Sequence, residues 1–178
     1  MGRSAALLCL VTLVQAPHVH LSDGWAQARL MQAVFGAQAR LMRPECQRVV
    51  ADFQDGEGRP LLERLNATGM TAPEYLEKKV WFVDGDDTPR CRRSPRVAAF
   101  TTPGHHVVKI CSARFSRAFE RQPVAAEMLV IHEMLHTLGL GERPPSSAVI
   151  TATVTKRCGR NKRRRLKIGA ASATMLHA

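Results

Sequence analysis

The stretch HEMLHTLGLGE, residues 132–142, places two histidines four residues apart with a glutamate directly after the first. The preceding residues, PVAAEMLVI, begin with Pro123, and proline is tolerated in the first turn of a helix because its missing N–H needs no partner there. Gly139 is a residue type that commonly follows the end of a helix. We therefore predict a helix from Pro123 to Gly139. Because it is apolar on almost every side, we expect it to be buried.

Helical residues four positions apart project from the same side of a helix, one turn above the other. His132 and His136 can therefore reach a single metal ion. Glu133 lies one step round the helix, beside such an ion rather than on it, where it can accept a proton from bound water. Zinc lowers the pKa of its bound water to about 7. The spacing predicts a Zn²⁺ site with His132 and His136 as ligands and Glu133 as catalytic base.

A catalytic zinc usually has a third protein ligand and one open position. No Asp or Glu follows Glu142 in the chain, and the only later histidine is His177. Gly139 and Gly141 give the backbone the freedom to turn back toward the helix. We expect Glu142 to be the third ligand, with His177 as the alternative.

The competing interpretation of this segment is a core helix whose histidines are only hydrogen-bonded. Two imidazoles and a carboxylate in an apolar helix need partners that offset their burial. A metal ion is one such partner, so metal binding is the favoured prediction.

The segment also resembles the extended zinc motif of the metzincin branch of the zincin metallopeptidases. The two histidines, the glutamate after the first of them, and Gly139 match that motif. The third ligand of the family is usually histidine and here would be Glu142. Metzincins also carry a methionine turn beneath the metal, for which Met175 is the available residue. The resemblance implies a zincin-like fold that hydrolyses peptide bonds, with the substrate extended along an edge strand.

The rest of the chain predicts an α+β domain: a small mixed sheet, an active-site helix and flanking helices. Apolar periodicity predicts a helix over 24–42, and a short helix at 60–67 ends at Gly69. β-Formers predict strands at 79–83, 96–101 and 105–111, the last two joined by a turn at 102–104. Residues 146–159 read as a capped helix, although alternation at 150–154 leaves a strand open. We assign the zincin-like catalytic domain to residues 25–159.

The two ends of the chain differ from its middle. Residues 1–16 combine Arg3 with an apolar run of signal-peptide length, and cleavage could fall as late as residue 28. The net charge of +11 is concentrated in residues 156–167, whose eight Lys and Arg leave only +3 elsewhere. The basic tail, 160–178, is either a solvated end or a contact for a polyanion or anionic surface. No second long apolar stretch exists, so we expect no integral membrane span.

The cysteines support an exported protein. Cys9 would leave with the signal segment, and the remaining four form an even set, typical of an oxidising compartment. They lack the C-x-x-C spacing of a structural zinc site. Four cysteines allow three pairings, and the sequence leaves the connectivity open. In one of them, Cys91 with Cys111 would close two neighbouring strands, and Cys46 with Cys158 would tie the first helical region to the last. Four buried free thiols are the alternative.

These features together predict a small, secreted or periplasmic zinc metallopeptidase acting on a protein or peptide. A metal-dependent endoribonuclease with a related histidine motif would explain the basic tail. However, such enzymes lack the glutamate after the first histidine, and their third ligand is histidine. A zincin-like protein that binds metal without cutting is a third hypothesis.

Overall fold

The computed structural model describes residues 16–159. Residues 1–15 of the predicted signal segment (1–16), the basic tail, Met175 and His177 lie outside these residues. Signal-peptide cleavage as late as Ala28 would remove the strand at 18–20 and the start of the first helix. It would also remove Asp23, whose carboxylate accepts hydrogen bonds from two backbone N–H groups at that helix start. No helix in the described part of the chain is long and apolar enough to cross a membrane.

One small mixed sheet forms the back of the fold, with strand order β1-β2-β4-β3. β1, β2 and β4 run parallel, and β3 pairs antiparallel with β4 at the edge. The strands are β1 (His18–His20), β2 (Trp81–Asp84), β3 (Ala99–Thr101) and β4 (Val107–Ile110). The α+β class, the mixed sheet and the antiparallel hairpin are as the sequence predicts. β3 and β4 are shorter than predicted, and β2 begins two residues later and ends one residue later than predicted.

Eight α-helices and one 3-10 helix accompany the sheet within residues 16–159. They are α1 (Gly24–Leu41), α2 (Pro44–Gln47), η1 (Arg48–Asp52), α3 (Leu61–Asn66), α4 (Ala72–Lys78), α5 (Pro89–Arg93), α6 (Ser112–Arg121), α7 (Pro123–Thr137) and α8 (Ser147–Cys158). Residues 147–158 are helical, so the strand alternative there is wrong. Ser146 caps this helix through its side chain, and Ile150, Val154 and Cys158 form its buried stripe at helical spacing.

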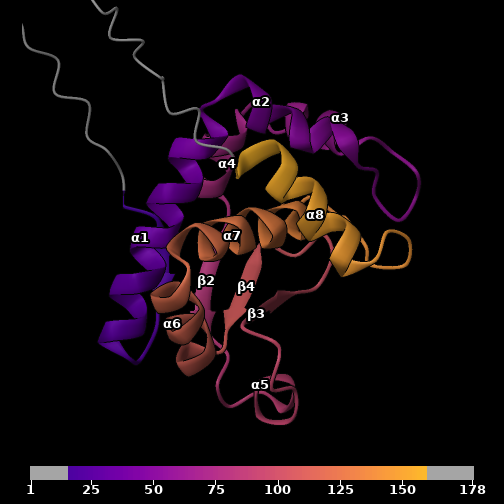
Figure 1. Ribbon diagram of the computed structural model, residues 1–178. Coiled ribbons are helices and arrows are strands. Elements are labelled where there is room, and N and C mark those ends of the chain that lie inside the picture. Colours follow the sequence, from indigo (N-terminus) through magenta and orange to yellow (C-terminus); the bar gives the residue numbers. More distant parts are fainter. Residues whose placement is uncertain (1–15, 160–178) are drawn as a thin grey trace, which may run out of the picture.

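α7 lies at the centre of the fold. It crosses in front of β2 and β4 and contacts α1, α6 and α8 (Figure 1). Ile131, Met134 and Leu135 on this helix are completely buried, as the apolar sequence predicts. Gly36 of α1 lets the helices approach closely, because a Cβ there would come within 2.5 Å of the Glu127 side chain. The helix that carries the histidines is therefore packed on several sides.

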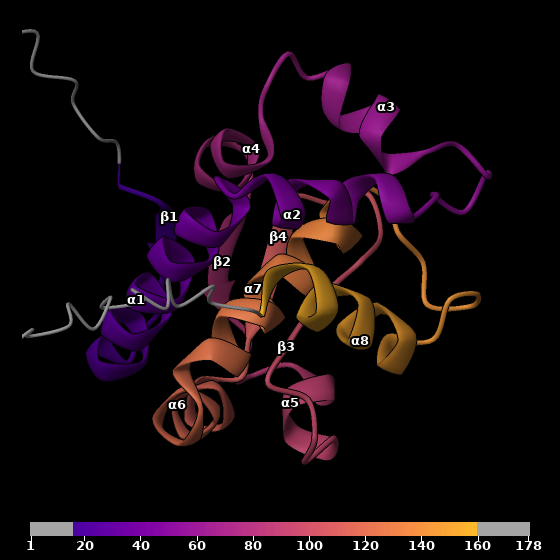
Figure 2. The same ribbon diagram turned by 45° about the horizontal axis from the view of Figure 1, so that its top comes forward.

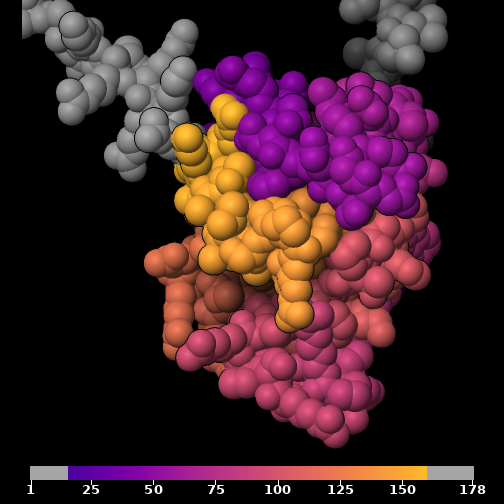
Figure 3. All heavy atoms as spheres, turned by 90° about the vertical axis from the view of Figure 1, so that its right-hand side faces the viewer, coloured from indigo at the N-terminus to yellow at the C-terminus, as the bar shows by residue number. Residues whose placement is uncertain are grey.

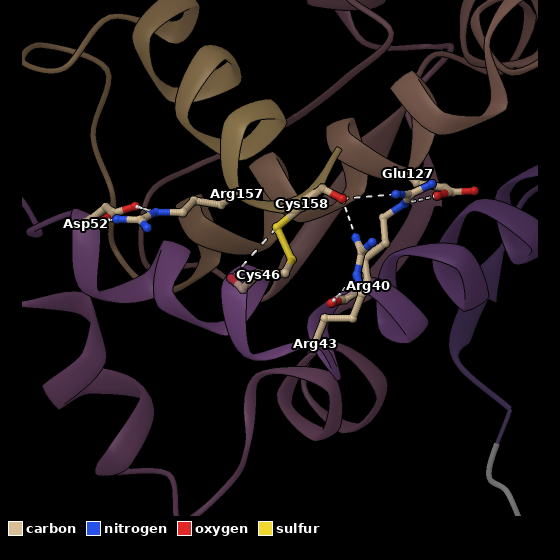
Figure 4. The surroundings of a disulfide bond; sticks show 7 residues. All are labelled: Arg40, Arg43, Cys46, Asp52, Glu127, Arg157 and Cys158. Atoms are coloured by element: carbon tan, nitrogen blue, oxygen red, sulfur yellow. Dashed lines mark hydrogen bonds and ion pairs between the residues drawn. A yellow bond between two sulfur atoms is a disulfide. The ribbon is translucent and has the colours of Figure 1, made fainter. Parts of the chain in front are cut away.

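Two disulfides join helices to the rest of the fold, Cys46 with Cys158 and Cys91 with Cys111, which is the arrangement described above among the three that the sequence left open. The first joins α2 to the last residue of α8, whose carbonyl accepts hydrogen bonds from Arg40 and Arg43 (Figure 4). Figure 2 shows the end of α8 beside α2. The second departs from expectation in one respect: Cys91 lies on α5 rather than on a strand, so the bond ties a helix-bearing loop to the residue after β4.

Candidate metal centre

A sharp turn at the end of α7 brings the chain back toward the histidines. Gly139 has φ +108°, a conformation that L side chains rarely adopt. The N–H groups of Gly139 and Leu140 donate to the carbonyls of His136 and Leu135, which closes the helix. The backbone then reverses, and Glu142 extends to the imidazoles three residues after the turn.

Three side-chain atoms converge at this turn. The Nε2 atoms of His132 and His136 lie 3.0 Å apart, and Oε1 of Glu142 is 3.9 Å and 3.4 Å from them, respectively. In a tetrahedral site with bonds of 2.0–2.1 Å, neighbouring ligand atoms are separated by roughly 3.3–3.4 Å. The three observed separations fall on both sides of that value. His132, His136 and Glu142 therefore form a group that could hold a metal ion.

The outer nitrogen of each imidazole has its own hydrogen-bond partner. Nδ1 of His136 lies 2.6 Å from the carbonyl oxygen of Leu140, which can only accept, so this nitrogen donates. Nδ1 of His132 lies 3.1 Å from Oγ1 of Thr151 on α8, a hydroxyl that can accept in the same way. These outer contacts leave the two Nε2 atoms facing each other, 3.0 Å apart. A hydrogen bond from Nδ1 to an outer partner is how histidine metal ligands are usually oriented.

Burial sets the charge state of these groups. Burial, followed by the neighbouring His136, lowers the pKa of His132 to about 4, against the opposing effect of Glu142. At neutral pH this imidazole is therefore uncharged, the form that binds metal. Burial, followed by the charge of Glu142, raises the pKa of Glu133 to about 8, while Arg90 and the Thr101 backbone N–H oppose the rise.

Glu133 is buried beside the three converging residues rather than among them. Its Oε2 atom has no hydrogen-bond partner within residues 16–159, although the side chain is only 4% exposed. An unpartnered buried carboxylate oxygen is costly and is found where a ligand or catalytic role compensates for it. The position suits a group that exchanges a proton with a molecule bound next to the metal group.

A cleft of about 360 Å³ opens over these residues. α7 contributes its floor, β3 one edge, the loop around α5 a second wall, and α8 the opposite side. Figure 3 looks onto this face, where the segment leading into α8 overhangs the part of the chain that contains α5 and β3. Residues along the cleft include Arg90, Arg96, Phe100, Thr101, Leu129, His132, Glu133, His136, Glu142, Ser147 and Thr151. His132, His136 and Glu142 are thus accessible to a ligand in the cleft.

All four site residues that the sequence singled out meet in this cleft. The sequence did not reveal Thr151, which reaches His132 only because α8 packs on α7, nor the arginines of the α5 loop. Thr151 lies one residue after Ile150 of the predicted apolar stripe, a position that a helical wheel would have placed next to the buried face.

Comparison of the chain with protein-family models, curated protein sequences and solved structures finds no match. The functional argument therefore depends on the geometry of the site.

Proposed function

We propose that the protein is a zinc-dependent metallopeptidase. The observation that carries the proposal is the convergence of two imidazole nitrogens and one carboxylate oxygen beside the unpartnered, buried carboxylate of Glu133 in an open cleft. Two nitrogens and an oxygen suit zinc, which in catalytic sites takes three protein ligands and leaves a position for water or substrate. His132, His136 and Glu142 would hold the ion.

Zinc, when bound, polarises the scissile carbonyl and lowers the pKa of a water molecule. Glu133 then accepts the proton of the attacking water and returns it to the nitrogen of the departing amine. Leu140 and Thr151 keep the two imidazoles oriented throughout.

β3 offers a place for an extended peptide. The Cys111 N–H donates to the Ala98 carbonyl, which in an antiparallel ladder assigns Phe100 to Lys109 as the next hydrogen-bonded pair. The backbone groups of Ala99 then point away from β4, as do those of Thr101, whose N–H faces Glu133. No other strand among residues 16–159 covers this edge. A peptide paired there by backbone hydrogen bonds would lie along the cleft.

The decisive experiment tests cleavage of an unstructured protein by the purified, zinc-loaded chain, with the products sequenced by mass spectrometry. Chelation should abolish cleavage and added zinc should restore it. A single-stranded RNA is offered in parallel. Cleavage of the RNA but not the protein would favour the endoribonuclease hypothesis. Metal binding with neither activity would favour a non-catalytic zincin-like protein.

The two disulfides fit an oxidising compartment, and we extend the proposal to a secreted or periplasmic protein. Mass spectrometry of exported material, without reduction, tests this part by detecting both bonds and the start of the mature chain.

A further inference from the structure

The wall of the cleft that α5 forms is strongly basic. Residues 89–98 contain four arginines and no acid. Two of them, Arg90 and Arg96, line the cleft, whereas Arg92 and Arg93 do not. Both cleft arginines are exposed, and neither forms an ion pair with a carboxylate within residues 16–159. Their charges are thus available to a ligand in the cleft.

The guanidinium of Arg90 is placed beside the edge strand. It lies over the ring of Phe100 on β3, 5.0 Å from the ring centroid, a contact that orients an arginine without neutralising its charge. The loop itself is fastened, because Cys91 is bonded to Cys111 and its carbonyl accepts from Arg114 of α6. Arg90 therefore projects from a fixed support next to the strand along which a peptide would pair.

The set of charged residues in the cleft favours an anionic ligand. The lining contains two arginines, Arg90 and Arg96, and two carboxyl groups, those of Glu133 and Glu142. A divalent ion held by His132, His136 and Glu142 would add two positive charges to this set. A guanidinium recognises a carboxylate with paired, charge-assisted hydrogen bonds.

We propose that Arg90 and Arg96 form a carboxylate-recognition site, so that this cleft selects peptides with a carboxylate on the segment bound beside α5. The inference rests on the proposed peptidase function and specifies its substrate class. The carboxylate comes either from an Asp or Glu side chain or from the C-terminus of a peptide. Both sources present the same group to the arginines.

The test measures kcat/KM of the zinc-loaded protein on paired peptides. One series compares Glu with Gln at each position around the cleaved bond, and another compares a free C-terminus with a C-terminal amide. We expect one carboxylate peptide to be preferred about 10- to 100-fold over its neutral partner, the usual effect of a hydrogen bond to a charged group. Which series shows the preference identifies the source of the carboxylate. Equal rates in every pair would overturn the proposal.

The variant Arg90→Gln/Arg96→Gln should lose this preference, and the matched control Arg92→Gln/Arg93→Gln should keep it. Both remove two charges from the same loop. Because the preference is a ratio measured on one preparation, it does not depend on the fraction of correctly folded protein. The preference should also shrink in high salt, which screens exposed charges. If the Arg90→Gln/Arg96→Gln protein still prefers the carboxylate peptide, other residues recognise the carboxylate and the proposal is overturned.

A failure of the proposed function is distinguishable from a failure of this inference. If no peptide is cut, hydrolysis is wrong, and the affinities of the same peptide pairs for the zinc-loaded protein decide the arginine assignment. Equal affinities would overturn it. An RNA oligonucleotide that binds more tightly than any peptide and depends on Arg90 and Arg96 would also overturn it, in favour of a polyanion ligand.

Discussion

His132 and Thr151 are joined by a 3.1 Å contact between Nδ1 and Oγ1, so α8 orients an imidazole that belongs to α7. We predict that Thr151→Val lowers the affinity for zinc about 10- to 100-fold, the usual effect of losing the outer partner of a histidine ligand. Thr155→Val is the matched control, since it changes the same helix one turn further on. Competition with a zinc-sensitive dye measures both. Equal affinities of the two variants would remove Thr151 from the site.

The second prediction concerns the third ligand. Glu142→Ala and His136→Ala should each release zinc, with a larger loss than Thr151→Val, because each removes one of three ligand atoms. His177→Ala should retain it. Elemental analysis after dialysis gives the zinc content of each protein. If Glu142→Ala retains zinc and His177→Ala loses it, Glu142 is not the third ligand. Only His132 and His136 of the motif would then remain as ligands.

The third prediction separates binding from catalysis at Glu133. Glu133→Gln should retain zinc yet reduce kcat about 10²- to 10⁴-fold, the usual contribution of a positioned general base. The amide preserves the shape of the buried side chain but cannot accept the proton. If this variant cuts at the parent rate, another group activates the water. If it loses zinc, Glu133 is a ligand.

The fourth prediction is that metal-free protein becomes less stable as pH rises from 6.5 to 8. The pKa of Glu133 is raised from 4.5 to about 8, mainly by burial, so the folded state binds more protons than the unfolded state between these values. The pKa of His132 is lowered from 6.5 to about 4, mainly by burial, which makes stability rise with pH below 6.5. Above pH 6.5, of these two groups, only Glu133 still changes the free energy of unfolding with pH.

This effect corresponds to a loss of about 2 kcal/mol over that interval. Urea unfolding in the presence of a chelator measures it. Glu133→Gln should show a flat profile, and an unchanged slope in that variant would assign the titration to another group.

The fifth prediction ranks the two disulfides. Cys46–Cys158 closes a span of 112 residues and Cys91–Cys111 a span of 20. By restricting the unfolded chain, the Cys46–Cys158 bond should raise the free energy of unfolding by about 4–5 kcal/mol and the Cys91–Cys111 bond by about 3 kcal/mol. Denaturant unfolding of Cys46→Ala/Cys158→Ala and of Cys91→Ala/Cys111→Ala compares them. A smaller destabilisation from the longer loop would contradict the ranking.

Local sequence signals account for most of the arrangement of His132, His136 and Glu142. The start of α7 at Pro123, its end near Gly139, and the return of Glu142 are all specified within twenty residues. The contact of Thr151 with His132 and the approach of α5 to β3 depend instead on how separate elements pack, which no single segment encodes. For the same reason the sequence did not predict β1, because this strand has only three residues and its partner strand begins about sixty residues later.

Two of the helices that the sequence analysis did not predict, α4 and α6, nevertheless have signals in the sequence. α4 carries a capping box, in which Thr71 and Glu74 serve each other's backbone, and this pattern is visible in the sequence. α6 is mostly polar, but its apolar side chains share one side of the helix, where Phe115 is buried and Phe119 packs against the core. Its amphipathic pattern is therefore present in the sequence, although the helix contributes few apolar side chains to the core.

The three residues that could hold a metal ion, His132, His136 and Glu142, all belong to the single segment 132–142. A loop this short costs little entropy to close, so the denatured chain retains some affinity for the ion. Zinc should then raise the free energy of unfolding by less than its affinity for the native protein implies, because part of that affinity is shared by the denatured state. A refolding molecule would already carry its ion on this segment before α8 brings Thr151 to His132.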